Sequence, residues 1–246
     1  MAIIALLTAI LLPSLSNARQ QANSAGCLSN LRQLAHGWPM YSDENDDVIL
    51  PGRHAALPGG LSNPAHYFDV GNGTKYRARW IAVVGKYVGI PAWDQPIPTD
   101  DRQDYDSRVY QCPAVPDWVD TRNHAFGYSH QFLGNARTKY GRFVNYPVNR
   151  SRIRNFASTV MAMDSLGSAA GLPRTQRKEH NNRGTDEAEA GNHVWTLDPA
   201  RLTAASDRGS GDPGARRTAP DEQHGGRASG LFCDGHAIRT PAVALG

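Results

Sequence analysis

The chain begins with an apolar run that gives way to a one-sided pattern of apolar and polar positions. Residues 2–12 carry no charge and a single hydroxyl group, at Thr8. Further along, apolar residues recur at the spacing of a helix with 3.6 residues per turn. They are Leu28, Leu31, Leu34, Ala35 and Trp38. The pattern predicts one helix from about Ala2 to about Gly37, with a kink at Pro13 and an end at Pro39.

This apolar run is short for a membrane span. At about 1.5 Å per residue, residues 2–12 would extend roughly 16 Å, whereas a bilayer core is about 30 Å thick. A secretory signal peptide would need a basic residue before the apolar stretch, but the first basic residue is Arg19. A helix that is apolar all round must lie in lipid or among other helices, so we expect this stretch to associate.

Beyond the first helix the chain predicts short elements separated by loops. Apolar positions at helical spacing predict a second helix over residues 80–88, ending at Gly89. Strands are predicted in residues 109–113, 125–134 and 158–165. Two apolar runs flank Asp234-Gly235 and predict a hairpin with a two-residue turn. Residues 167–223 are rich in Gly, Arg, Asn, Asp and Pro and are predicted to form long loops, with a short element at residues 193–197.

Composition and charge narrow the class of protein. The hydrophobic fraction of 40% lies below the usual range of about 45–50%, and 24 glycines and 16 prolines indicate a loop-rich domain. The net charge of +3 is small, and basic residues do not cluster with aromatic ones. We therefore expect no nucleic-acid partner.

The three cysteines leave two interpretations open. Cys27, Cys112 and Cys233 are far apart and form no CxxC pair, which excludes the usual zinc-ribbon patterns. In an oxidising compartment a disulfide between Cys27 and Cys112 would attach the N-terminal helix to the globular part. Alternatively, all three are buried free thiols.

Two groups of residues are candidate cation sites. The first comprises His224, Asp234 and His236, joined by Asp164, because histidine and carboxylate side chains that converge can bind a divalent metal. The alternative is that Asp234 serves the turn and the histidines bond to loop backbone. The second group, Asp43, Asn45 and Asp47, alternates like a calcium loop but lacks its glycine and its final glutamate. Calcium or zinc is thus the candidate cofactor, and a solvated acidic loop the alternative at the second group.

Both ends of the chain resemble one family. The apolar helix with Pro13, the string Cys27-Leu-x-Asn-Leu-Arg-Gln-Leu, and Tyr41 before an acidic loop resemble the start of type IV pilin-like proteins of the bacterial H-X9-DG class. At the other end, His224 is followed by nine residues and then Asp234-Gly235, which is the H-X9-DG signature itself. The middle of the chain fits this family only loosely.

The resemblance implies an α+β fold in which a long N-terminal helix packs on an antiparallel sheet with long loops. Residues 1–42 would form the helix, apolar and assembling over 1–13 and amphipathic over 14–38, and residues 43–246 the head domain. The protein would be exported, anchored in the inner membrane with the pilus or secretion machinery, and then assembled with copies of itself into a cell-surface filament, without enzymatic activity. The residues of the filament core would be Ile3, Ile4, Leu6, Leu7, Ile10, Leu11, Leu12 and Pro13.

The resemblance also implies residues before Met1. With about ten further residues the apolar run would reach the roughly 20 that span a bilayer. Two other functions stay open. One is a minor, membrane-tethered pilin-like module of a type II secretion-like system, binding carbohydrate through the loops of residues 167–223. The other is an exported metal-dependent enzyme that uses His224, Asp234 and His236.

Overall fold

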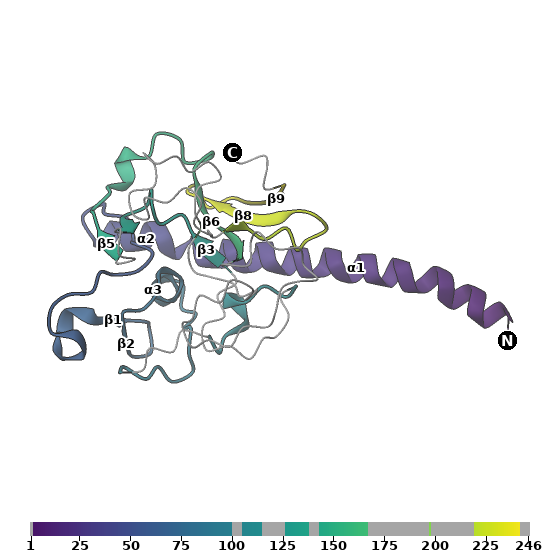
Figure 1. The fold of residues 1–246 in the computed structure, drawn as a ribbon, viewed down its shortest axis with the longest axis horizontal. Coiled ribbons are helices and arrows are strands. Elements are labelled where there is room, and N and C mark those ends of the chain that lie inside the picture. Colours follow the sequence, from purple (N-terminus) through teal and green to yellow (C-terminus); the bar gives the residue numbers. More distant parts are fainter. Residues whose placement is uncertain are drawn as a thin grey trace.

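The protein is a long helix joined to a head of short helices and antiparallel strands, seen in a computed structural model (Figure 1). The structure describes residues 2–99, 105–114, 126–137, 143–166, 197 and 219–241. Helix α1 (Ala2–Ala35) extends from the head, with its N-terminal end far from every other labelled element. The predicted mixed α+β class is confirmed.

Helix α1 continues through Pro13, although the proline ring removes one intrahelical hydrogen bond there. Two hydroxyl groups on either side of this point bond back to the helix: Thr8 donates to Ile4 O at 3.0 Å and Ser14 to Leu11 O at 2.8 Å. Among the described residues, no helix is both long enough and apolar enough to span a bilayer.

The predicted end of the first helix at Pro39 is wrong. Helix α1 ends at Ala35, and a second helix, α2 (Gly37–Glu44), follows at once. His36 between them keeps a helical backbone, with φ −61° and ψ −28°. Pro39 lies in the first turn of α2, where the backbone N–H groups have no partner within the helix, so its missing N–H costs little.

The central sheet has the strand order β3-β6-β8-β9, with β7 beside β6 and every pairing antiparallel. Its strands are β3 (Phe126–Tyr128), β6 (Val160–Leu166), β7 (Ala219–Pro220), β8 (Ala228–Phe232) and β9 (Ala237–Thr240). Two small antiparallel pairs lie apart from it: β1 (Tyr67–Asp69) with β2 (Thr74–Tyr76), and β4 (Asn135–Arg137) with β5 (Phe143–Asn145). Single-turn 3₁₀ helices occupy Gly60–Ser62, Pro64–His66, Arg108–Tyr110 and Arg150–Arg152.

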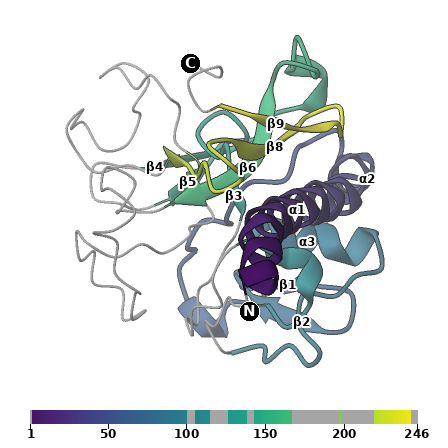
Figure 2. The same ribbon diagram turned by 90° about the vertical axis from the view of Figure 1, so that its right-hand side faces the viewer.

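The C-terminal half of α1 lies between this sheet and helix α3 (Trp80–Tyr87), as the view along the helix shows (Figure 2). Aromatic side chains complete the packing. Trp38 Nε1 donates to the Tyr128 hydroxyl at 2.9 Å, and that hydroxyl donates to Leu50 O at 2.7 Å. Trp80 stacks on Tyr128 with 4.9 Å between ring centroids. These bonds satisfy the polar atoms of two buried aromatic rings and connect α2 to β3.

Helix α3 confirms the second predicted helix, and β3 and β6 confirm strands within residues 125–134 and 158–165. The strand predicted over residues 109–113 is wrong. Residues Arg108–Tyr110 form a 3₁₀ turn, in which Tyr110 N donates to Ser107 O, and the chain after it carries Cys112 inward. Of the element predicted at residues 193–197, all but Leu197 lies outside the described residues.

The C-terminal hairpin is confirmed, but its loop has three residues, not two. Leu231 pairs with Ala237, and Phe232 N donates to His236 O at 3.0 Å, which leaves Cys233, Asp234 and Gly235 in the loop. Gly235 has φ +86° and supplies the left-handed residue that ends a loop of this length. Cys233 N donates to Thr159 O at 3.0 Å, so this residue belongs to the packed side of the loop.

Candidate functional site

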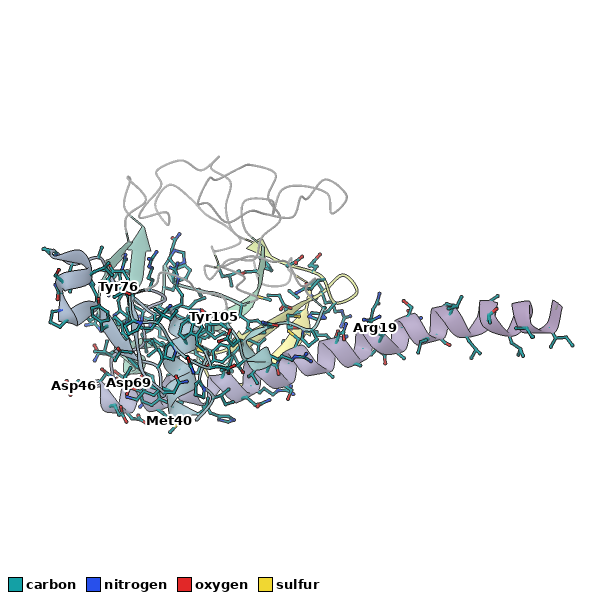
Figure 3. The ribbon with its side chains drawn as sticks, turned by 90° about the horizontal axis from the view of Figure 1, so that it is seen from below. Arg19, Met40, Asp46, Asp69, Tyr76 and Tyr105 are labelled. Carbon is teal, nitrogen blue, oxygen red and sulfur yellow. The ribbon has the colours of Figure 1, made fainter. Side chains whose placement is uncertain are left out.

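The N-terminal half of α1 exposes its apolar side chains. Figure 3 shows side chains leaving this part of the helix with no other described segment beside them, beyond Arg19. The large apolar residues whose side chains the structure describes here have exposed fractions between 54% and 75%. They are Ile3, Ile4, Leu7, Leu11, Leu12 and Leu15. Pro13 is exposed as well, and the side chains of Leu6 and Ile10 lie outside the described residues. We call residues 2–15 the apolar arm.

The C-terminal half of the same helix is packed on one side. Its buried residues follow one helical stripe: Ser24, Cys27, Leu31, Leu34 and Ala35. The predicted amphipathic stripe through Leu31, Leu34 and Ala35 is therefore confirmed, and Leu28 beside it is partly buried. The stripe also carries two polar groups, the Ser24 hydroxyl and the Cys27 thiol, which point to a group of chemically active side chains in the head.

Four side chains from four distant segments meet at this point. Cys27 comes from α1, Cys112 from the segment after the 3₁₀ turn, Asp164 from β6, and His224 from the turn that precedes β8. All four are buried, and one ligand atom from each lies within 4.8 Å of those of the other three. We call these residues the Cys-Asp-His cluster.

Short contacts connect the cluster. Cys27 Sγ donates to Asp164 Oδ1 at 3.3 Å, and His224 Nε2 lies 3.2 Å from both Asp164 Oδ2 and Cys112 Sγ. The other ring nitrogen of the histidine, Nδ1, shares a hydrogen bond of 3.0 Å with Ser24 Oγ. Asp164 Oδ2 also accepts the backbone N–H of Ser229 at 2.7 Å. Each side chain is therefore held in one orientation by the others or by β8.

The electrostatics of the cluster follow from burial and from these contacts. Burial raises the pKa of the Cys27 thiol well above its usual value, and the nearby Cys112 and Asp164 act in the same direction. Hydrogen bonds from Cys27 and His224 lower the pKa of Cys112. Burial alone would lower the pKa of His224, but its bonds to Asp164 and Cys112 outweigh this and raise it to about 9. The contacts with Asp164 and Cys112 thus favour the protonated form of His224.

The structure brings together two of the four residues first considered as metal ligands. Asp164 and His224 meet as predicted. Asp234 lies instead in the hairpin loop and His236 directly after it, and the two bond to each other: His236 Nδ1 lies 2.5 Å and the His236 backbone nitrogen 3.1 Å from Asp234 Oδ1. Neither belongs to the cluster. The bond from the His236 backbone to Asp234 is the turn chemistry considered as the alternative, but the ring bonds that the structure describes for the two histidines go to side chains and not to loop backbone.

Cys27 and Cys112 are neighbours, as the disulfide interpretation required, and in this structure they are not joined. Both are free thiols, and Cys233 is the third buried free thiol. Cys233 lies outside the cluster, and its burial, with the nearby Asp234, raises its pKa to about 12. In this structure all three cysteines are therefore free thiols, which is the second of the two interpretations left open by the sequence.

The acidic loop after α2 is engaged by an arginine. Arg150 contacts Asp43 Oδ1 at 2.6 Å and Asp47 Oδ1 at 3.2 Å, and Ser151 N donates to Asp47 Oδ2 at 3.0 Å. The pKa of Asp47 is lowered, first by its bonds to Ser151 and then by Arg150. Asn45 donates to Tyr41 O at 2.7 Å. A guanidinium group therefore occupies the position considered for calcium.

The two cysteines of the cluster were missed as ligands by sequence reasoning. No two of the four cluster residues are close in the chain, so no spacing motif exists to find them. The sequence did offer one indication of them. It was the expectation that Cys27 and Cys112 lie close together, which was not combined with the candidate ligands His224 and Asp164. Comparison of the chain with protein-family models, curated proteins and solved structures finds no match.

Proposed function

We propose that this chain is a pilin-like structural subunit, which assembles with copies of itself into a filament through the apolar arm. The observation that carries the proposal is the exposure of this arm on a helix that extends away from the head (Figure 1). Single exposed leucines are ordinary on protein surfaces, but a contiguous set on one projecting helix marks an interaction site.

The distribution of these side chains favours a bundle of helices over a single partner surface. Residues 2–12 are apolar on every side of the helix. A groove or a sheet would cover one side and leave the others in water, whereas a helix surrounded by like helices is covered all round. Identical subunits joined head to tail generate an open helical filament when the contact does not close. Copies of this chain are therefore the proposed partners.

The absence of charge in the arm supports the same arrangement. No acidic or basic residue occurs between Ala2 and Ala18, and Arg19 is the first. Burying an unpaired charge between helices is costly. Helices packed along a common axis over this stretch would bury none. The head has a core of its own that contains none of the described side chains of the arm, so assembly through these side chains does not compete with folding.

The rest of the proposal follows from the resemblance to pilin-like proteins. The subunit is exported, held in the inner membrane with its assembly machinery until it is incorporated, and then displayed at the cell surface. Its role is structural and not enzymatic. The embedded half of α1 joins the head to the filament core, because the same helix belongs to both.

The test places two glutamates in the arm and two elsewhere on the helix. Leu7 and Leu11 are exposed one turn apart in the arm, and Ala22 and Ala25 are exposed residues on the same helix outside it. We expect the wild-type chain and Ala22→Glu/Ala25→Glu to form filaments in electron micrographs, and Leu7→Glu/Leu11→Glu to form none. Circular dichroism should show the same folded head in all three.

Two results would contradict the proposal. One is filaments in the Leu7→Glu/Leu11→Glu variant as abundant as in the wild type. The other is a wild-type chain that stays monomeric at every concentration, because an arm that copies of the chain do not cover is not an assembly surface.

A further inference from the structure

We propose that Cys27, Cys112, Asp164 and His224 bind one Zn²⁺ ion as a structural site that fastens α1 to the head. This inference does not depend on filament formation. It differs from the metal site considered from the sequence, which used Asp234 and His236. It rests on the ligand types, on their separations and on the groups that orient them.

The ligand set selects the metal. Two sulfur atoms, one imidazole nitrogen and one carboxylate oxygen converge at the cluster. Calcium and magnesium take oxygen ligands, whereas thiolate and imidazole together are typical of zinc. Four protein ligands fill a tetrahedral zinc site and leave no open position, which is the arrangement of structural and not of catalytic zinc.

The separations are close to those of a tetrahedron. With Zn–S distances of about 2.3 Å and Zn–N or Zn–O distances of about 2.0 Å, neighbouring ligand atoms lie about 3.3–3.8 Å apart. The structure has Cys27 Sγ and Asp164 Oδ1 at 3.3 Å, and His224 Nε2 at 3.2 Å from Cys112 Sγ. The four ligand atoms all lie within 4.8 Å of one another, so movements of up to about 1 Å would bring every pair into the tetrahedral range.

The surrounding groups hold the ligands in the orientations that a metal needs. Ser24 Oγ bonds to His224 Nδ1, which leaves Nε2 directed at Asp164 and Cys112. Ser229 N holds one oxygen of Asp164, and Gln223 Nε2 donates to Cys112 Sγ at 3.5 Å. Such outer bonds fix ring orientation and ligand basicity in metal sites. A random meeting of four buried groups would not be expected to supply all of them.

Charge and access are also consistent with zinc. Two thiolates, one carboxylate and a neutral imidazole around Zn²⁺ leave a net charge of −1, the same as in a Cys₃His site. The N–H groups of Ser229 and Gln223 point at this charge. Ser24 and His224 line a surface pocket beside α1, together with Gln20 and Arg227, so the His224 side of the cluster lies next to solvent.

The chain supplies a matched pair of variants for the test. Cys112→Ser removes a ligand of the cluster, and Cys233→Ser removes a buried thiol outside it. The reduced full-length protein is titrated with Co²⁺ and with Zn²⁺. We expect one equivalent of Co²⁺ to give the visible absorption of a tetrahedral thiolate site in the wild type and in Cys233→Ser, and Zn²⁺ to displace it. In Cys112→Ser this spectrum should be lost.

A second pair of variants tests the orientation of the ligands. Ser24→Ala keeps all four ligands but removes the bond to His224 Nδ1, and should weaken Zn²⁺ binding about 10- to 100-fold. His236→Ala should leave the affinity unchanged. If Cys112→Ser fails to fold, shown by circular dichroism, Cys27→Ser takes its place as the variant that lacks one ligand of the cluster.

Three outcomes would overturn the inference. The first is a reduced wild-type protein that binds no Co²⁺ or Zn²⁺. The second is binding that Cys112→Ser leaves intact. The third is native protein whose mass is lower by two hydrogen atoms and whose Cys27 and Cys112 are joined, because the cluster would then be the site of a disulfide. Metal analysis and mass spectrometry of the same preparation distinguish these results.

Discussion

The two halves of α1 belong to one continuous helix but have opposite surroundings. The large apolar side chains that the structure describes in residues 2–15 are more than half exposed, whereas Leu31 and Leu34 are fully buried between the sheet and α3. Apolarity does not separate them, since both halves are rich in leucine. The difference lies in the pattern of apolar residues. A stripe on one side of the helix can pack against the head, whereas a helix that is apolar on every side cannot be covered by the head alone.

The largest difference between the halves concerns the stability of the head. Leu31→Ala removes a fully buried side chain and should lower the free energy of unfolding by about 2–5 kcal/mol. Leu11→Ala, on the same helix, removes a side chain that is 61% exposed and should change it by less than about 0.5 kcal/mol. Urea unfolding of both variants as monomers measures this. Equal losses would mean that the apolar arm belongs to the head.

A smaller difference concerns pH. The ring of His54 stacks on Phe68 at 3.6 Å between centroids, and its Nε2 atom has no hydrogen-bond partner among the described residues. Burial, with the nearby Arg77, lowers its pKa from 6.5 to about 4. The unfolded chain therefore takes up the proton first as pH falls, and the head should lose about 2–3 kcal/mol between pH 6.5 and 4.

The contrast with the arm makes this prediction specific. Residues 2–18 contain no titratable side chain, so contacts between arms should not change over the same pH range. The measurement is urea unfolding at a series of pH values for the wild type and for His54→Gln. Between pH 6.5 and 4 the free energy of unfolding of the variant should fall less than that of the wild type. Equal falls in both proteins would contradict the lowered pKa of His54.

Strong local patterns in the sequence predicted part of this molecule. The stripe of α1, the compact apolar helix α3 and the Asp234-Gly235 hairpin each rest on neighbouring residues. Long-range contacts decided what was missed. Pro39 does not end the helical region, because helix α2 begins before it, at Gly37. Gly37 lies so close to α3 that a Cβ atom at this position would be 2.3 Å from Val84 O. The hairpin loop includes Cys233, whose backbone N–H bonds to Thr159, a residue far away in the chain.

The candidate site shows the same limit. His224 and Asp164 were found as chemically active residues, but Asp234 and His236 were grouped with them because they are close in sequence. The actual neighbours of His224 are Ser24 and Cys112, which are 200 and 112 residues away. The packing of α1 on β8 and β9 brings these segments together, and such a long-range contact leaves no local pattern in a single sequence.

The most direct test of the account is a cryo-electron microscopy reconstruction of the filament formed by the full chain. It should show residues 2–15 of neighbouring subunits packed against one another along the filament axis, with the heads arranged outside. Filaments whose contacts lie between heads, with the arms exposed to solvent, would contradict the claim that the apolar arm is the assembly surface.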